Sequence, residues 1–347
     1  MSFNILNIGE HVLIDNSIVN CEYHSYPPYA NTTLNNSDEI RIPIQTQEIY
    51  TLPTNSFLYF EGRLLDNTKK FSATLSFVNN FMAYLFDEIR YELTGVVVDR
   101  TLKKILINVR QELVLIRSST DMNAIVTTNV HEKAHVELYK VMWRMPHVQV
   151  ADIEKLRLLK YIENGRDLEI AFRSWELHEY PVLQQTTRHT WNVKATNQLE
   201  KPRFVILALQ TDRKGINTKN SSHFDHCDLR SVKLYLNSDT YPYDNLIFDF
   251  VKNHTSILYE MYAQFQQAYY YKNCSEPSLT YKDFLLKAPL FVIDCSRQNE
   301  SLKSGSVDIR LEFETDKNVP ENTTAFCLIL HDRLVKYNAL SNTVKIV

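Results

Sequence analysis

Two histidines and a glutamate in the first half of the chain have the spacing of a zinc site. His131, Glu132 and His135 fit the pattern H-E-x-x-H. In zinc proteases this pattern places both histidines on one face of a helix and lets the glutamate act as general base. Here residues 136–143 mix apolar and polar side chains as a strand does, and no third histidine follows at the metzincin spacing. We therefore expect a loop that leads into a strand, with a zinc metalloprotease kept as an alternative.

Two further groups of polar residues could also do chemistry. The segment 223–227 (His-Phe-Asp-His-Cys) could bind a metal, but its spacing is local and no second pair of ligands accompanies it. Asp294, Ser296, His331 and Asp332 contain the residue types of a hydrolase triad, but the chain lacks the G-x-S-x-G nucleophile pattern. We expect a loop at the first group and structural hydrogen bonds at the second. The sequence thus predicts no catalytic, cofactor-binding or metal-binding residue.

Three tryptophans and one amphipathic segment are of kinds that also occur in binding surfaces. Trp143, Trp175 and Trp191 could stack on sugars, yet each lies in a strand-like run, so we expect them in a core or a subunit interface. Residues 243–271 could form an amphipathic helix that binds a membrane. That segment lacks the Lys/Arg-rich polar face of such helices, so packing against its own domain is expected.

Composition excludes several common classes of protein. The chain has only 6 glycines in 347 residues, against a usual share of about 7%. They are isolated, whereas a phosphate-binding loop needs several close together, so P-loop and Rossmann nucleotide sites are not expected. The formal net charge is −3 without a basic run, which gives no footprint of sequence-specific nucleic-acid binding. No apolar run is long enough to span a membrane, and no secretory leader is expected.

The cysteines fit reduced thiols. There are five of them, an odd number that is spread widely, unlike a disulfide framework or a zinc site. They are Cys21, Cys227, Cys274, Cys295 and Cys327. Cys327 lies in an apolar run, so we expect it to be a small buried hydrophobic residue.

Alternation with period two is the dominant structural signal. Between positions 307 and 314 every odd residue is apolar and every even residue is charged, which a strand produces and a helix does not. Similar patterns or short apolar runs predict strands at 40–45, 57–60, 112–116, 136–143, 168–173, 204–209, 232–236 and 291–293. Alternation on one face indicates antiparallel sheets, because parallel sheets are buried on both faces. Many short strands joined by polar loops favour sandwiches or barrels.

Helices are expected to be few, and their positions suggest a repeat. Apolar residues at three- and four-residue steps predict a helix over 243–271, with weaker candidates at 79–86 and at 152–161, the last capped by Asp152. The helices at 79–86 and 243–271 hold similar places in the two halves. Because 347 residues exceed the size at which one core usually stops growing, about 250 to 300 residues, we expect two domains, 1–185 and 186–347.

Short segments spread along the chain carry a resemblance to a known family. They are 86–93 (FDEIRYEL), 113–118, 143–146 (WRMP), 173–177 (RSWEL), 189–191 (HTW), 201–204 (KPRF), 236–237, 241–242 and 292–300 (VIDCSRQNE). In this order and spacing the chain resembles the double jelly-roll major capsid proteins of the adenovirus and Polinton/Maverick (adintovirus-like) lineage. That group includes endogenous viral copies in animal genomes.

The resemblance implies a fold, a function and partners. The implied fold is all-β: two tandem eight-stranded antiparallel jelly rolls, with a few short helices in loops. The implied function is structural and not enzymatic: homotrimers that look like hexagons self-assemble into an icosahedral shell, beside a penton or minor capsid protein, with the virion as location. No cofactor is expected. The alternative from another class is a host-domesticated, capsid-derived protein that binds a ligand or a cell surface.

Overall fold

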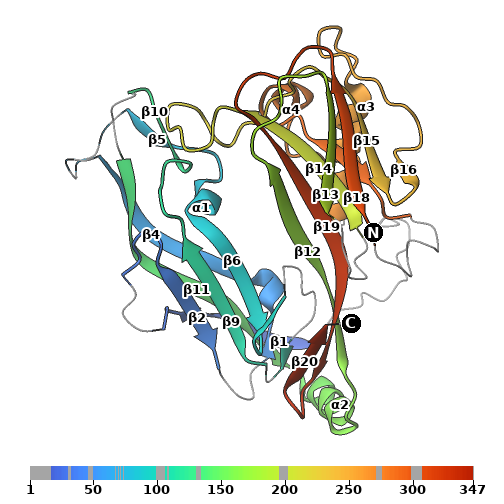
Figure 1. Cartoon of the computed structure of the whole chain (residues 1–347). Helices are drawn as coiled ribbons and strands as arrows, with labels where there is room; N and C mark the ends of the chain where they lie inside the picture. Colours follow the sequence, from blue (N-terminus) through green and yellow to red (C-terminus); the bar gives the residue numbers. More distant parts are fainter. Residues whose placement is uncertain are drawn as a thin grey trace, which may run out of the picture.

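The computed structural model describes residues 17–29, 33–45, 50–66, 68, 70, 72, 74–98, 106–107, 109–129, 134–194, 202–270, 276–297 and 307–346. Over these ranges the chain forms two β-sandwiches that stand side by side (Figure 1). All strand pairs between named strands are antiparallel. No helix within the described ranges is long and apolar enough to cross a membrane.

The first sandwich, called roll 1 below, is built by the first half of the chain. One sheet contains β1 (Ile18–Tyr26), β11 (Ala134–Val150), β3 (Tyr50–Thr51) and β8 (Leu106–Ile107), with β4 (Phe57–Asp66) also paired to β11. The facing sheet has the order β2 (Glu39–Ile44), β9 (Gln111–Arg117), β6 (Phe86–Leu93) and β7 (Val96–Val97). A separate two-stranded sheet pairs β5 (Leu75–Phe77) with β10 (Ile125–Thr127).

The second sandwich, roll 2, repeats this arrangement. One sheet has the order β12 (Leu168–Tyr180), β19 (Thr323–Asn338), β14 (Pro202–Thr211) and β17 (Phe291–Asp294), with β20 (Thr343–Ile346) added to β19. The facing sheet has the order β13 (Arg188–Lys194), β18 (Ile309–Thr315), β15 (Leu229–Leu236) and β16 (Asp239–Tyr241). These are the sheets of a double jelly roll.

The two rolls correspond strand by strand. The sheet β2-β9-β6-β7 of roll 1 matches β13-β18-β15-β16 of roll 2, and β1, β11 and β4 match β12, β19 and β14. All the predicted strand segments are confirmed, because the period-two pattern places apolar residues in the sandwich. In β18 the odd residues, such as Leu311 and Phe313, are buried while Arg310 is exposed. The expected repeat at the level of architecture is therefore present.

A buried ion pair fixes the core of roll 1. Arg117 at the end of β9 is fully buried and lies 2.9 Å from Asp121, which is also buried. The guanidinium also donates to the carbonyl of Leu85 at 2.6 Å, and Asp121 accepts from the backbone N–H of Val136 at 2.8 Å. Each charge is thus compensated by a partner and hydrogen bonds, the condition under which buried ions are tolerated.

The longest predicted helix is shorter in the structure. The helix expected over 243–271 begins only at Ser256: α3 spans Ser256–Tyr270. The residues before it are not helical because Phe248 is buried in the core and its N–H donates to Arg230 of β15. The other helices are α1 (Phe81–Tyr84), α2 (Asp152–Glu163) and α4 (Tyr281–Lys287).

Two details of the helix expectation are wrong. Because α1 precedes β6 and α3 follows β16, these helices do not occupy equivalent places in the two rolls. The residue before α2 is Ala151, and Asp152 is its first helical residue instead of its cap. Asp152 still carries negative charge in the first turn, where it interacts favourably with the helix dipole.

The position of β12 bears on how the chain divides. This strand lies inside the expected first unit, 1–185, yet it pairs along its whole length with β19 of roll 2. The link between the sheets of the two rolls is α2, between β11 and β12. Strand pairing over such a distance leaves no local signal in the sequence.

Candidate functional site

One histidine of the zinc-protease motif falls within the described residues, and it lies on a strand. His135 lies in β11, paired with Leu65 of β4, so it sits on a strand and not on the helix that the zinc chemistry requires. His131 and Glu132 lie outside the described residues. Among the residues that the structure describes, no group of three or more His, Cys, Asp or Glu side chains is placed to hold a metal ion.

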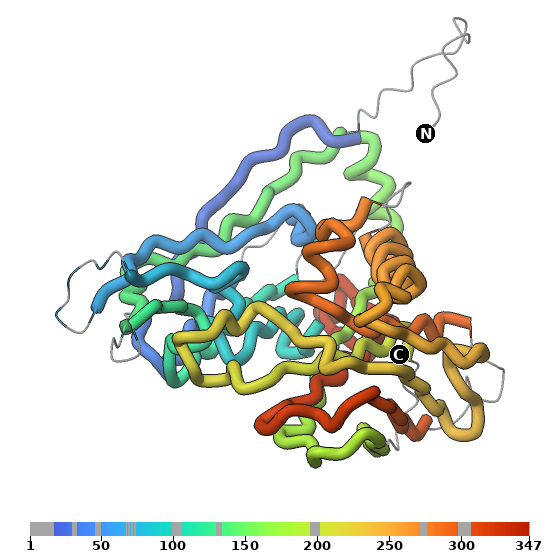
Figure 2. The backbone as a smooth tube through the Cα atoms, turned by 90° about the horizontal axis from the view of Figure 1, so that it is seen from above, coloured from blue at the N-terminus to red at the C-terminus, as the bar shows by residue number. Residues whose placement is uncertain are grey.

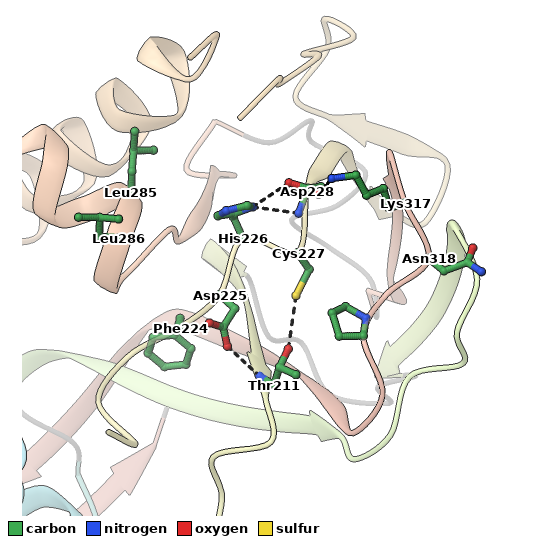
Figure 3. Close-up of a pocket in the computed structure, with 11 residues that line it drawn as sticks. Thr211, Phe224, Asp225, His226, Cys227, Asp228, Leu285, Leu286, Lys317 and Asn318 are labelled. Atoms are coloured by element: carbon green, nitrogen blue, oxygen red, sulfur yellow. Dashed lines mark hydrogen bonds and ion pairs between the residues drawn. The ribbon is translucent and has the colours of Figure 1, made fainter. Parts of the chain in front are cut away.

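Residues 224–227 of the segment 223–227 line an open hollow of about 530 Å³ in roll 2 (Figure 3). Asp225 accepts from the backbone N–H of Thr211 at 2.9 Å and from the guanidinium of Arg213 at 2.6 Å. The ring of His226 accepts from the backbone N–H of Asp228 at 2.9 Å. These polar groups hold the loop in shape, as the sequence predicted.

The thiol in this hollow is not poised for chemistry. Cys227 lies 3.6 Å from the hydroxyl of Thr211, and burial raises the pKa of its thiol to about 11. The reactive species is the thiolate, which is scarce near neutral pH at such a pKa. Asp228, the neighbouring carboxylate, is paired with Lys317 at 2.7 Å.

The residues of the second polar group make local structural contacts. Asp294 accepts from the backbone N–H of Ser296 at 2.8 Å, which closes a local turn. His331 is buried, and its Nε2 lies 3.4 Å from Glu176 of β12. Asp332 makes ion pairs with arginine side chains. The carboxylates of Asp294 and Asp332 are thus paired with a backbone N–H and with arginine side chains.

Two of the three tryptophans lie in the cores. Trp143 belongs to the core of roll 1 and meets Tyr91 edge to face, and Trp191 belongs to the core of roll 2. Trp175 on β12 remains 39% exposed and packs against Tyr269 of α3. The helix α3 packs on its own roll, as the sequence predicted, where it covers the outer face of the β14 sheet.

The contacts between the two rolls are the feature that the sequence did not reveal. At the lower end in Figure 1, a shared apolar cluster joins Leu93 and Val98 of roll 1 to Phe172 of roll 2. Tyr337 of β19 is fully buried in the same cluster, and its hydroxyl donates to the carbonyl of Ile107 at 3.1 Å. The remaining buried members of the cluster are Leu106, Val109, Ile170 and Val335.

A second contact joins the rolls at the opposite end. The loop after β14 reaches across to the region around β10, as Figure 1 shows. The N–H of Gly215 donates to the side chain of Asn123 at 2.8 Å, and the N–H of Thr127 donates to the carbonyl of Asn217 at 2.8 Å. Because the two rolls contact each other at both ends, neither can rotate about a single point of contact. The rolls therefore form a single rigid block.

Exposed apolar side chains mark further surfaces. The helix α2 has no buried residue, and Ile153 and Leu156 are 68% and 60% exposed. Tyr23 and Phe57 lie on the outer face of the β1-β11-β4 sheet, with ring centroids 5.5 Å apart. Aromatic residues gathered on a surface are typical of protein interfaces.

Comparisons with known proteins agree with this architecture. The model of the double jelly roll-like domain family matches residues 100–335. The chain belongs to this family. No curated protein matches the chain in sequence.

Solved viral structures share the fold over nearly the whole chain. A chain of the Sputnik virophage, solved by cryo-EM, has a TM-score of 0.64 at 7% identity, with 99% of this chain and 91% of that chain covered. The PBCV-1 protein VP54 has a TM-score of 0.58 at 9% identity, covering 94% and 97%. The mavirus major capsid protein has a TM-score of 0.54 at 9% identity, covering 100% and 93%. At such low identity the likeness concerns the fold.

Proposed function

We propose that this protein is a structural, non-enzymatic capsid protein that self-associates into trimers, which tile an icosahedral viral shell. The observation that carries the proposal is the pair of equivalent jelly rolls held rigidly side by side. Three such pairs around an axis present six similar rolls and an outline close to a hexagon, which can tile a surface. In a closed ring every copy uses both of its contact surfaces, so no contact surface is left without a partner copy.

The parts of the chain have distinct roles in this proposal. The two apolar cores give each roll its stiffness. The inter-roll cluster around Tyr337 sets the angle between the rolls. Exposed faces and loops supply the contacts between copies. The likeness to solved viral structures, one of which is the mavirus major capsid protein, supports this assignment.

Finer proposals concern units, lineage and location. We place the two units at 17–150 and 168–346, with α2 as the link, because β12 shares a sheet with β19. Expression of 168–346 as a folded unit would support this division.

The sequence segments quoted above support a place in the adenovirus/Polinton lineage, location in the virion, and a penton or minor capsid protein as partner. Phylogenetic grouping with virophages instead of that lineage would overturn the lineage assignment.

Negative-stain imaging of the concentrated, purified protein tests the proposed function. Hexagonal particles or shells are expected. A field of separate single-chain particles at every concentration would contradict the capsid function and favour the host-derived ligand-binding alternative. Metal analysis of the same sample addresses the remaining alternative, since a stoichiometric zinc content would revive the metalloprotease.

A further inference from the structure

Roll 2 offers a template for contacts that roll 1 lacks. The lower parts of β12 and β19 are covered by roll 1, where Phe172 is 4% exposed and Tyr337 is fully buried. The outer face of their sheet is covered by α3, whose Phe265 packs on Phe204. The strands equivalent to β12 and β19 are β1 and β11 of roll 1. We therefore expect another segment or another chain to cover β1 and β11.

Within the described residues, β1 and its neighbours have no such cover. All but the last residue of β1 are exposed, and β1 pairs only with β11 (Figure 2, dark blue beside green). Tyr23, Phe57 and Tyr59, which are 45%, 49% and 41% exposed, form an aromatic surface on this sheet, called the β1 patch below. Arg144, which pairs with Phe57 in the sheet, brings positive charge to the patch. Tyr and Arg are the residue types enriched among interface hot spots.

A matching surface lies on roll 2. In roll 1, Val98 directly follows β7 and is fully buried against roll 2. The equivalent strand of roll 2 is β16, and the residues after it, 243–251, are called the post-β16 segment below. There Tyr243, Ile247 and Val251 are 92%, 62% and 77% exposed. In Figure 1 β16 lies on the side of roll 2 that faces away from roll 1.

The two surfaces also complement one another in charge. Arg144 in the β1 patch is partly exposed, so it brings a cation to this surface. The post-β16 segment carries Asp244, an exposed carboxylate next to Tyr243. One surface thus offers aromatic rings with a cation, and the other offers apolar side chains with an anion. The surfaces belong to opposite rolls, so one chain can use both at once with two different copies.

We propose that the post-β16 segment of one copy covers the β1 patch of a second copy, head to tail. This inference rests on the proposed trimer and names its interface. The contact repeats between chains the arrangement that already joins roll 1 to roll 2 within a chain. Three such contacts close a ring in which rolls 1 and 2 alternate. A head-to-tail contact that closes on itself leaves neither surface bare.

Cross-linking of the full chain tests this contact directly. Cys21 on β1 is an exposed thiol beside the β1 patch, and the variant Asn245→Cys adds one to the post-β16 segment. A short bismaleimide should then produce dimer and trimer bands on a denaturing gel. The matched control Leu286→Cys, on an equally exposed site of α4 outside both surfaces, should not. Both variants carry Cys227→Ser and Cys274→Ser. The other native cysteines, Cys295 and Cys327, are buried, so Cys21 and the introduced cysteine are the thiols expected to react.

Substitution of each surface gives an independent test. The double variant Tyr23→Glu/Phe57→Glu and the double variant Tyr243→Glu/Ile247→Glu should each weaken self-association by more than about tenfold. Leu286→Glu should leave it unchanged. Because all four replaced side chains are well exposed, the fold should survive, which circular dichroism checks.

The outcomes separate this inference from the proposed function. Trimers that form in the unmodified protein but give no Asn245→Cys cross-link, or that persist in both double variants, overturn the proposed contact and leave the capsid function standing. Absence of any oligomer in the unmodified protein overturns both.

Discussion

Replacement of Phe172 by alanine should weaken the block formed by the two rolls. The ring is 4% exposed and lies in the cluster that joins β12 and β19 to roll 1. Truncation of a buried phenylalanine to alanine typically costs about 3–5 kcal/mol, because a cavity remains where the ring was. We expect a loss of that size in the free energy of unfolding, measured by guanidinium chloride denaturation followed by tryptophan fluorescence.

A milder substitution in the same cluster separates packing from hydrogen bonding. Tyr337→Phe keeps the ring but leaves the carbonyl of Ile107 without its donor, at an expected loss of about 1–3 kcal/mol. Leu286→Ala, at an exposed site on α4, is the control and should change stability by less than about 0.5 kcal/mol. If Phe172→Ala cost no more than that control, the inter-roll cluster would not hold the rolls together, and the reasoning would be refuted.

Three other perturbations probe separate parts of the structure. Asp121→Ala leaves Arg117 buried without its counter-charge, so the free energy of unfolding should fall by about 3–5 kcal/mol in thermal denaturation; an unchanged melting temperature would contradict the buried pair. Burial raises the pKa of the Cys227 thiol to about 11, so its alkylation, followed by peptide mass spectrometry, should be slow at pH 8 and accelerate toward pH 11; fast labelling at pH 8 would show an exposed thiolate. Burial and the adjacent His24, stacked at 4.0 Å, lower the pKa of His147. The unfolded chain then binds more protons, so stability should fall as the pH drops below about 6.5, and His147→Phe should reduce that fall.

Much of the fold follows from local pattern. In 307–314 the alternation of apolar and charged residues leaves a strand as the only element that can bury one face, and β18 forms there. The same logic holds for β2 and β15. The polar groups around Asp294 and in 223–227 lack the spacing that metal binding or hydrolysis requires, and in the structure Asp294 and Asp225 accept hydrogen bonds from nearby backbone N–H groups.

The errors come from tertiary context. Ile247 and Val251 have helical spacing relative to Ile257 and its neighbours, yet Phe248 between them enters the core of roll 2, which holds this segment in extended form along β15. Intrinsic periodicity is a weak guide where a single buried side chain decides the path of the chain.

The inter-roll contacts had no signal in the sequence. Tyr337 and Ile107 are 230 positions apart, and nothing in either local pattern indicates their hydrogen bond. The pairing of β12 with β19 is equally remote in the sequence. Apolar residues near the ends of strands indicate that they are buried. Which segment of the chain buries them depends on the packing of the whole chain.

The mass of the purified chain in dilute solution tests the central claim most directly, because self-recognition is the activity that the two rolls are proposed to serve. Light scattering coupled to size exclusion should give three times the chain mass of 40.7 kDa, with no intermediate dimer dominating. A single species at 40.7 kDa that persists as the protein is concentrated would contradict the account.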